Sequence, residues 1–474
     1  MIYDTVVVGA GVGGIASALL RSQHESHVLL LEQHSLLGGC SSYFQRGPYS
    51  FDVGATTLSG LKAGQSLGDF CHRLSLDLPV KKIDPGIHFH LCSGKELLRF
   101  SDFEKWQTEL SKIKMENREL WHHLEDLEKL SWTVLSKLRP FKGISPGLVL
   151  KALNPEVFKL LPFFMINAER DLSRFQQNSP EFIELINGIN LISAQAHAHQ
   201  IPAFVGAMSL TYPKETYYPL GGMKGLMNFF EKELINRSVT IRKRESVVGL
   251  QEEKDSLTLI TAKGEKIETK KVIFNLTHWA LENILQGKLR RKIQNEIQKR
   301  QEGPAAFCLY FAVKLPTPMK NLYHQVHLVS KDVPNYFISF SDPEDLSRAP
   351  SGEQTVTISI HVDSKEWREL DRQDYLDLKM KYQKIIMEDF SQRFHPLEIK
   401  FLSSSSPKTF IRFTQRPQGM VGGLPLLYGQ GPWDFLLPEI SEGRVFRVGD
   451  TVFPGQGWVG VVAGALNLEE ILQS

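Results

Sequence analysis

The feature that most constrains this chain is a glycine pattern in the stretch "TVVVGAGVGGIASALL" near its N-terminus. A β-branched run at residues 5–8 is followed by Gly9-x-Gly11-x-x-Gly14 and then by a helical sequence. In such a strand–turn–helix unit the first glycine permits a tight turn, the second lets the backbone approach a pyrophosphate, and the third lets the helix pack close to the strand. The anion lies at the helix N-terminus. The pattern predicts a Rossmann-type dinucleotide-binding unit.

The segments that follow bear on which dinucleotide is bound. The run "HVLLLE" predicts a second buried strand that ends at Glu32, whose carboxylate can accept both hydroxyls of an adenosine ribose. An NAD-binding domain would continue with another helix and strand. This chain instead has Gly38 and Gly39, and then Gly54, which indicate a second close approach of the backbone to the ligand. The arrangement suits a longer cofactor that lies along the chain.

Composition limits the class of protein. The 474 residues are 42% hydrophobic, which is enough for two or three domain-sized cores. Lys plus Arg (55) nearly balance Asp plus Glu (53), so nucleic-acid binding is not expected. No signal peptide and no apolar run of about 18 residues is evident, so a cytoplasmic protein that does not cross a membrane is expected. Scattered cysteines without metal-binding spacing favour a reducing compartment; they are Cys40, Cys71, Cys92 and Cys308.

Several longer motifs are more specific than the glycine pattern alone. They are "LLGGCSSYF", "YSFDVGATTLSG", "YYPLGGMKGL" and the closing "VGDTVFPGQGWVGVVAGA". Together, and in order along the whole chain, they resemble the carotenoid desaturase and isomerase family of flavoproteins, within the wider amine-oxidase-like FAD superfamily. The motifs "GIHFHL", "PLGGMKGL" and "GDTVFPGQG" are most similar to the prolycopene isomerase and all-trans-retinol saturase branches. The resemblance implies an α/β fold: a Rossmann-type FAD-binding domain, and a mixed-sheet substrate domain with a helical cap.

The resemblance also implies that FAD lies extended between the two ends of the chain. The run "RVFRVGD" predicts a last parallel strand, residues 444–448, that delivers Asp450 to a ribityl hydroxyl. The helix that follows directs its N-terminal amides at the flavin. In the superfamily that this chain resembles, cysteinyl flavins use a residue near the C-terminus; no cysteine follows Cys308, so the resemblance implies a non-covalent flavin. The residues expected to contact FAD are Gly9, Gly11, Gly13, Gly14, Glu32, Gly38, Gly39, Cys40, Gly54, Val247, Gly449, Asp450, Gly457 and Val459.

The same motifs divide the chain. The FAD-binding domain is expected to comprise residues 1–75, 213–288 and 432–474, and the substrate-binding domain residues 76–212 and 289–431. In the substrate domain, "GIHFHL", "AAFCLYFAV", "QTVTISIHV" and "KTFIRF" predict strands, and residues 372–392 predict a long helix. Apolar residues at three- and four-residue spacings between Trp106 and Leu127 predict another helix.

Residues 131–164 of the cap mix aromatic and basic residues. The basic ones are Lys137, Arg139, Lys142, Lys151 and Lys159. Four prolines exclude a spanning helix, but short basic amphipathic segments suit a membrane interface. Peripheral membrane association is therefore expected, with an ordinary helical cap over a core as the alternative.

Two other features lead to expected absences. The pairs His88/His90 and His197/His199 have a two-residue spacing that, on a strand, would place both rings on one face, but no third ligand or carboxylate partner is evident, so no metal site is expected. Cys40 follows the double glycine where many amine-oxidase-like relatives carry arginine, so a guanidinium contact to the cofactor is expected to be lost.

The resemblance implies an FAD-dependent enzyme that acts on a long apolar polyene by hydride exchange with the flavin. Carotenoid cis–trans isomerisation or desaturation is the leading hypothesis, and saturation of one double bond is the alternative. Net oxidation or reduction would require an electron acceptor or donor such as a quinone. No catalytic acid or base can be assigned. A flavin amine oxidase would need an aromatic cage, for which Trp458 and Phe453 are candidates, and a lysine near the ring. A non-catalytic flavin-binding or membrane-associated protein is a third class.

Overall fold

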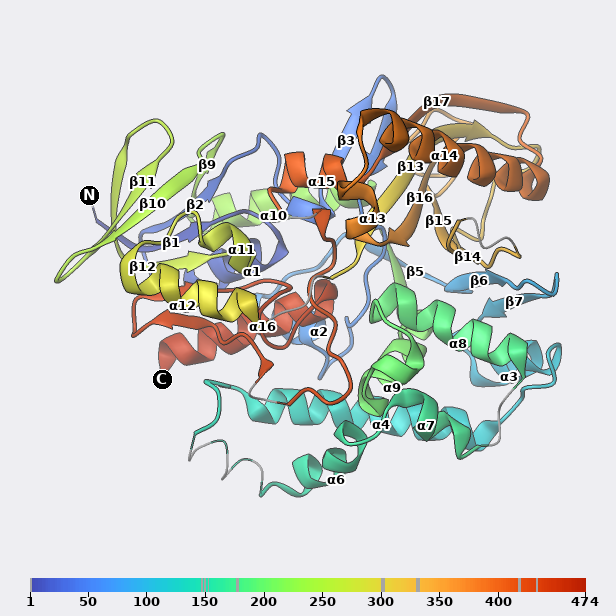
Figure 1. Cartoon of the computed structure of the whole chain (residues 1–474), viewed down its shortest axis with the longest axis horizontal. Helices are drawn as coiled ribbons and strands as arrows, with labels where there is room; N and C mark the ends of the chain where they lie inside the picture. The colour runs from blue at the N-terminus through green and yellow to red at the C-terminus, as the bar shows by residue number, and fades with distance from the viewer. Residues whose placement is uncertain are drawn as a thin grey trace.

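The computed structural model describes residues 2–145, 148, 151, 153–175, 179–299, 303–329, 333–416, 419–431 and 434–474. Figure 1 shows two β-sheets beside each other, with the helices α4 and α6 to α9 below the second sheet. Both ends of the chain lie at the first sheet. The predicted α/β architecture, with a mixed second sheet and a helical cap, is confirmed.

The first sheet is the doubly wound sheet that the glycine pattern predicts. Its central strands run parallel in the order β9-β2-β1-β12-β19. The chain thus builds the sheet to one side of β1 and then to the other, which creates a topological switch point between β1 and β12, where such sheets bind ligands. These strands are β1 (Tyr3–Val8), β2 (Val28–Glu32), β9 (Thr240–Lys243), β12 (Lys266–Phe274) and β19 (Val445–Arg447). The last strand predicted at residues 444–448 is confirmed, slightly shorter.

Strand β1 shows why this sheet is covered on both faces. Val7 packs with the helices α1, α2, α10 and α16, whereas Val6 and Val8 pack with α11, α12 and the antiparallel pair β10–β11. The covering elements are α1 (Val12–Arg21), α2 (Ser66–Leu74), α10 (Gly222–Asn236), α11 (His278–Leu281), α12 (Gly287–Gln298), α16 (Gly457–Gln473), β10 (Val247–Glu252), β11 (Leu257–Thr261) and β18 (Glu439–Ser441). A strand buried on both faces explains the continuous apolar run.

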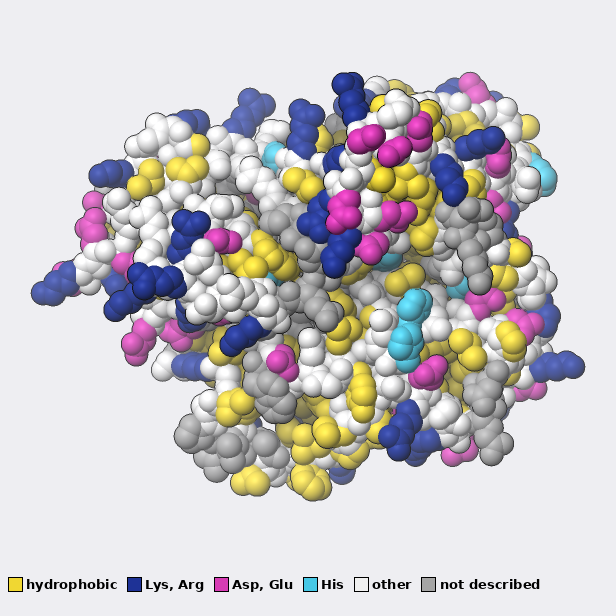
Figure 2. Space-filling model, viewed as in Figure 1, with side chains coloured by type: hydrophobic (Ala, Val, Ile, Leu, Met, Phe, Trp, Pro, Cys, Tyr) yellow, Lys and Arg dark blue, Asp and Glu magenta, His cyan; other side chains and the backbone are white. Residues whose placement is uncertain are grey.

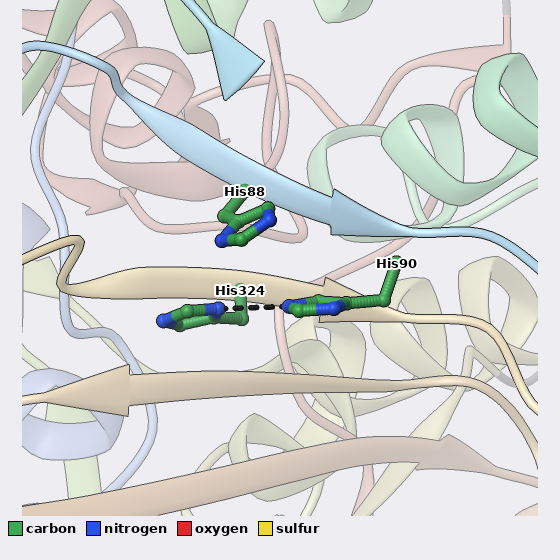
Figure 3. Close-up of side chains that lie close together, drawn as sticks. All are labelled: His88, His90 and His324. Carbon is green, nitrogen blue, oxygen red and sulfur yellow. Dashed lines mark hydrogen bonds between the residues drawn. The ribbon is translucent and has the colours of Figure 1, made fainter. Parts of the chain in front are cut away.

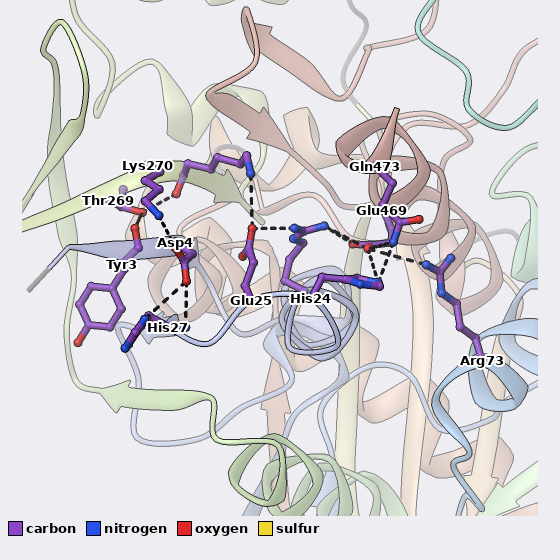
Figure 4. A network of polar contacts seen from close by, with 12 residues as sticks. Tyr3, Asp4, His24, Glu25, His27, Arg73, Thr269, Lys270, Glu469 and Gln473 are labelled. Atoms are coloured by element: carbon purple, nitrogen blue, oxygen red, sulfur yellow. Dashed lines mark hydrogen bonds and ion pairs between the residues drawn. The ribbon is translucent and has the colours of Figure 1, made fainter.

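A polar network holds the two ends of the chain together (Figure 4). Arg21 of α1 pairs with Glu469 of α16 at 3.0 Å, and both side chains are almost fully buried. Arg73 of α2 also reaches Glu469, at 3.8 Å. Because α1 and α16 each begin at a glycine-rich loop, this network fixes the two loops relative to each other.

The second sheet is mixed, with the order β17-β13-β16-β15-β14-β6-β7. All neighbours are antiparallel except β14 and β6. The long helix α14 packs on it through Ile386 and Phe390. The elements are β6 (Ile87–His90), β7 (Glu96–Arg99), β13 (Ala305–Lys314), β14 (Tyr323–Val326), β15 (Tyr336–Phe340), β16 (Gln354–Val362), β17 (Glu398–Ser405), α13 (Ser364–Arg368) and α14 (Arg372–Phe394). Short pairs adjoin both sheets: β3 (Tyr43–Arg46) with β4 (Tyr49–Asp52), and β5 (Val80–Ile83) with β8 (Thr216–Pro219).

Two secondary-structure predictions are wrong. The segment "KTFIRF" lies in a helix, α15 (Pro407–Thr414), because Ser406 and Thr409 form a capping box and Pro407 occupies the first turn. The amphipathic stretch after Trp106 forms two helices, α3 (Phe103–Ser111) and α4 (Arg118–Leu138), which are separated where Lys114 takes a positive φ of 57°.

The cap comprises α4, α6 (Pro155–Phe164), α7 (Ala168–Ser173), α8 (Pro180–Ser193) and α9 (Ala203–Thr211). Part of the predicted membrane-contacting segment, residues 146–147, 149–150 and 152, lies outside the described residues. Within the described chain, no helix combines the length and the hydropathy that crossing a bilayer requires. The predicted domain boundaries stay a prediction.

Candidate cofactor and substrate site

A cavity of about 1370 Å³ runs from the carboxyl ends of the first sheet to the cap helices. Its walls come from both glycine-rich loops, from the second sheet and from α4, α6, α8 and α9. Single-ligand pockets typically span about 300–1,000 Å³. The cavity therefore has room for a large cofactor together with a second ligand.

The N-terminal glycines form a turn that tolerates no side chains. Gly9 has a φ of +95°, and a Cβ on Gly14 would lie 1.9 Å from the carbonyl oxygen of Gly9. A Cβ on Gly11 would lie 2.6 Å from Asn275 Oδ1, and one on Gly13 would lie 2.8 Å from Asn275 Nδ2. Gly9, Gly11 and Gly13 line the cavity, whereas Gly14, in the first turn of α1, is buried against the carbonyl of Gly9. These positions match the roles predicted for the three fingerprint glycines.

Glu32 lies at the end of β2 and lines the cavity, although only 7% of its surface is exposed. Its Oε2 accepts a hydrogen bond from the Ala10 backbone N–H at 2.7 Å, and its Oε1 accepts one from the His34 N–H at 2.9 Å. Each carboxylate oxygen can accept a further bond. The backbone thus holds the carboxylate where a ribose diol could donate to it.

The remaining N-terminal candidates line the same cavity. Gly38 and Gly39 have positive φ values of 110° and 57°, and a Cβ on Gly39 would lie 3.3 Å from the Gly11 Cα. Gly54 lies against the carbonyl of Cys40, since a Cβ there would be 2.9 Å from that oxygen. Val247 begins β10 at the cavity wall. The double glycine is therefore packed directly on the fingerprint turn.

The C-terminal candidates close the other side of the cavity. Gly449, with a φ of +135°, and Asp450 follow β19, and Gly457 and Val459 begin α16. All four line the cavity, as do residues of the first turn of α1. Two helix N-termini thus point their free amides at one space. This arrangement favours an elongated anionic ligand.

Two residues that no sequence motif marks connect these loops. Asn275, directly after β12, donates from Nδ2 to the Val448 carbonyl at 3.0 Å, and its backbone N–H donates to Val8 at 2.8 Å. It therefore joins the N-terminal turn to the C-terminal motif. Arg416, beyond α15, donates to Asp450 Oδ2 at 2.7 Å. Neither residue lies in a recognisable motif, so only their position in the folded chain reveals them.

Arg416 bears on the expectation that a guanidinium contact to the cofactor is lost at Cys40, which stays a prediction. Burial raises the pKa of the Cys40 thiol, and the charge of the nearby Arg416 opposes that rise. A guanidinium group therefore stands beside Cys40 at the cavity wall, although it comes from a distant part of the sequence. A guanidinium group can therefore reach this part of the cavity wall from a residue other than the one that follows the double glycine.

The two glycine-rich loops and Glu32 together form what we call the cradle. Beyond the cradle the cavity is largely apolar. Side chains of the cap form this part, including Leu135, Leu138, Leu160, Phe164, Leu191, Phe204 and Met208. The second sheet contributes polar groups, among them His361, whose pKa burial lowers to about 4. Burial raises the pKa of Glu128, although a hydrogen bond from Trp132 opposes the rise. Both groups are thus pushed toward their neutral forms, which suits an apolar ligand.

The expectation that His88 and His90 have no third imidazole or carboxylate beside them is wrong. His324 of β14 lies beside His88 and His90, and Glu96 accepts hydrogen bonds from both of the latter. Burial lowers the pKa of all three histidines. It lowers the pKa of His90 to about 4 and that of His324 well below its ordinary value. The pair His88/His90 therefore has a third imidazole and a carboxylate beside it, neither of which the sequence reveals.

The fold and the cradle define an extended-dinucleotide-binding protein whose ligand lies between the two ends of the chain. The cradle fits FAD, because side chains are excluded where a pyrophosphate must approach and a carboxylate lies where the ribose belongs. Comparison with known proteins identifies the family. The model of the family described as flavin containing amine oxidoreductase matches residues 12–456. The chain belongs to this family, and it is an FAD-dependent oxidoreductase.

Individual relatives agree with this assignment. The chain is 25% identical to the chloroplastic prolycopene isomerase of Daucus carota, over 97% of this chain and 78% of that protein. It is 24% identical to the corresponding protein of Arabidopsis thaliana, over 97% and 81%. A short segment, 11% of this chain and 8% of the relative, is 49% identical to an all-trans-retinol 13,14-reductase of Danio rerio.

Solved structures share the fold at lower identity. An oxidoreductase from Methanosarcina mazei superimposes with a TM-score of 0.66 at 15% identity, over 98% of this chain and 100% of the other. The cyclohexylamine oxidase of Brevibacterium oxydans superimposes with a TM-score of 0.61 at 13% identity, over 100% and 98%. The amine-oxidase-like fold that the motifs implied is thus confirmed.

Proposed function

We propose that this FAD-dependent enzyme acts on a long apolar polyene and catalyses cis–trans isomerisation of a carotenoid. The observation that carries the proposal is the apolar part of the cavity, which continues from the FAD cradle between the cap helices and the second sheet. The volume of the whole cavity exceeds what one ligand requires, and apolar side chains of the cap helices line the part beyond the cradle. The names of the full-length relatives, prolycopene isomerases, support the same substrate class.

The residues around this space bind and orient rather than exchange protons. Bound FAD supplies hydride chemistry, for which a polyene offers delocalisation of the charge that develops. The apolar side chains of α4, α6, α8 and α9 would exclude water and hold the chain of double bonds in one register. Desaturation, or saturation of one double bond, is the second candidate, supported by the short match to a retinol reductase and a longer one to a diapophytoene desaturase.

An amine oxidase reading is less well supported. Among the cavity-lining residues that the structure describes, none is a lysine. Trp458 stacks on Phe230 of α10 with centroids 6.1 Å apart, and Phe453 packs with Phe141 at 4.3 Å. Both residues line the cavity, but each ring packs against a different aromatic partner.

One anaerobic experiment separates the candidate reactions. An isomerase whose flavin has been chemically reduced should convert many equivalents of a poly-cis carotene into a product of unchanged mass, while the flavin stays reduced. A saturase should form at most one product per flavin, about two mass units heavier, as the flavin becomes oxidised. A desaturase should require oxidised flavin. If no carotene or retinoid is changed and a small amine reduces the flavin rapidly, the polyene proposal is wrong.

We also propose that the protein binds membrane surfaces through α6. Figure 2 shows hydrophobic side chains gathered over this helix at the lower edge of the molecule. Ile144, Leu153, Phe158, Leu161 and Met165 are between 45% and 74% exposed. Leu161 and Met165 also line the cavity. An apolar surface continuous with the cavity wall would let a membrane-dissolved substrate enter directly.

The basic residues contribute less to this surface than the sequence suggested. Arg139 lies close to Asp69 and Glu470 with only 13% of its side chain exposed. Lys151 donates to the last carbonyls of the α4 end, including that of Arg139 at 2.6 Å. Lys137 pairs with Glu156 at 2.9 Å. Only Lys142 and Lys159 of the five are simply exposed, so binding should depend more on apolar contact than on charge.

The double variant Leu153→Ser/Phe158→Ser should therefore bind vesicles of phosphatidylcholine and phosphatidylserine at least tenfold more weakly. Burial of an apolar side chain contributes about 1.5–3 kcal/mol, and neither residue lines the cavity. Flotation measures the effect, and Leu346→Ser/Met380→Ser, which alters equally exposed apolar residues elsewhere, is the control. Equal flotation of both variants would leave α6 as an ordinary cap helix.

A further inference from the structure

We propose that His88, His90 and His324 form a binding site for a divalent transition-metal ion, with Zn²⁺ as its ion. Figure 3 shows His88 and His90 extending from β6 and His324 from the neighbouring strand β14. One nitrogen from each ring lies within 4.8 Å of the other two. The proposal is independent of the polyene assignment, since it concerns a different part of the molecule.

The topology brings the three rings together. Strands β6 and β14 are parallel neighbours, with His324 in register with His88. His88 and His90 lie two residues apart, so both rings project from the same face of the sheet. His90 and His324 are almost fully buried, and Phe394 of α14 packs against both rings. The cluster therefore lies between the sheet and α14.

The cluster is separate from the flavin cavity. Gln325, the residue after His324, lines that cavity. Because successive side chains of a strand point to opposite faces, the histidine cluster and the cavity lie on opposite sides of the sheet. An ion here would not contact the cofactor or the substrate.

The hydrogen bonds determine where the lone pairs point. His324 Nε2 must donate, because its partner at 2.8 Å is the carbonyl oxygen of Asn321. The carboxylate of Glu96, which is half-exposed, accepts hydrogen bonds from His88 Nε2 at 2.9 Å and from His90 Nδ1 at 3.1 Å. A neutral imidazole carries one N–H, so the inward nitrogens carry lone pairs. They are His88 Nδ1, His90 Nε2 and His324 Nδ1.

This arrangement leaves the centre of the cluster without a donor. His90 Nε2 and His324 Nδ1 lie at hydrogen-bond distance, 2.9 Å (Figure 3), but with these tautomers of the neutral rings both atoms are acceptors. His88 Nδ1 is buried and has no hydrogen-bond partner among the described residues. Buried polar atoms without partners are costly. A cation at the centre would satisfy all three lone pairs.

The outer contacts are those that metal-binding histidines use. Such rings commonly donate their second N–H to a carboxylate or to a backbone carbonyl, which fixes the tautomer and the ring orientation. Glu96 plays the first role for two of the rings and Asn321 the second. Three neutral imidazoles suit Zn²⁺, with water as the fourth ligand. Tetrahedral zinc bonds of about 2.0 Å place nitrogens about 3.3 Å apart, so nitrogens now up to 4.8 Å apart would have to approach by up to about 1.5 Å.

Zinc binding to the FAD-loaded, tag-free protein tests the proposal. After dialysis against a chelator, the protein is titrated with Zn²⁺ and bound metal is measured by mass spectrometry. We expect one ion per chain. His324→Gln should weaken binding at least 100-fold, and Glu96→Gln, at a half-exposed position, should weaken it by about 10–100-fold. The control is His197→Gln/His199→Gln, which alters the other closely spaced pair and should leave binding unchanged.

Thermal unfolding and X-ray absorption give readouts that do not depend on activity. Zn²⁺ should raise the Tm of the wild type and of the control, but not that of His324→Gln, because the ion joins strands that are far apart in sequence. The extended fine structure should report four nitrogen or oxygen ligands at about 2.0 Å, with the outer-shell scattering of imidazole rings. FAD content, measured in parallel, should be the same in all variants. If the wild type binds no more zinc than His324→Gln, His90 and His324 share a proton instead and the site is not a metal site.

Discussion

The variant Gly14→Ala is expected to lose most of its FAD and about 3 kcal/mol of its free energy of unfolding. A Cβ at this position would lie 1.9 Å from the Gly9 carbonyl oxygen and 3.2 Å from the Asn275 Cβ. Gly9 has a φ of +95°, and its N–H donates to the Leu31 carbonyl at 2.8 Å. Its own carbonyl is therefore held in place and cannot move aside. Helix α1 must shift instead, and its N-terminal amides leave the cofactor position. Overpacking typically costs about 1–3 kcal/mol and sometimes more.

The measurements are flavin released on acid precipitation, expected to fall at least tenfold, and denaturant unfolding of the apo proteins. Gly249→Ala, in β10 of the same sheet, is the matched control. A Cβ there would meet Ile260 only at ordinary contact distances, 3.5 Å and beyond, and Gly249 is not among the glycines with positive φ. It should keep the FAD content and the stability of the wild type. Full FAD occupancy in Gly14→Ala would contradict the role assigned to close helix–strand packing.

The parts of the site that sequence predicts well are short and local. The turn after β1, the acid at the end of β2 and the Gly449–Asp450 pair each need only a few consecutive residues, because strand, turn and helix start are fixed by local backbone geometry. All of these positions line one cavity except Gly14, whose role is packing. The order of motifs was also sufficient to predict the second, mixed sheet.

The parts that sequence does not reveal depend on contacts between distant segments. Asn275 joins two motifs that lie far from it on either side, and His324 meets His88 only because β14 pairs with β6. No local pattern encodes such pairings. The error at "KTFIRF" has a different origin: its β-branched and aromatic residues favour a strand, but the capping box at Ser406 prevails. The break before α4 likewise follows from backbone conformation at Lys114.

The second large effect concerns the ion pair between Arg416 and Asp450. Their side chains are only 16% and 14% exposed, and the pair stands at the cavity wall. Arg416→Met would leave the Asp450 carboxylate buried without its cation, a change that typically costs about 3–5 kcal/mol. The unpaired negative charge would also oppose an anionic cofactor. We expect FAD affinity to fall at least tenfold and the Tm of the apo protein to fall with it.

A double-mutant cycle distinguishes this pair from two independent contacts. Asp450→Asn alone should cost about 1.5–3 kcal/mol, because the buried Arg416 guanidinium loses the negative charge of its hydrogen-bond partner. Arg416→Met/Asp450→Asn removes both charges at nearly constant volume, so it should recover much of the stability that Arg416→Met loses. FAD affinity should recover less, since Asp450 would also have accepted a hydrogen bond from the cofactor. Strictly additive costs in both measurements would show that the two side chains act separately and that Arg416 has no part in positioning Asp450.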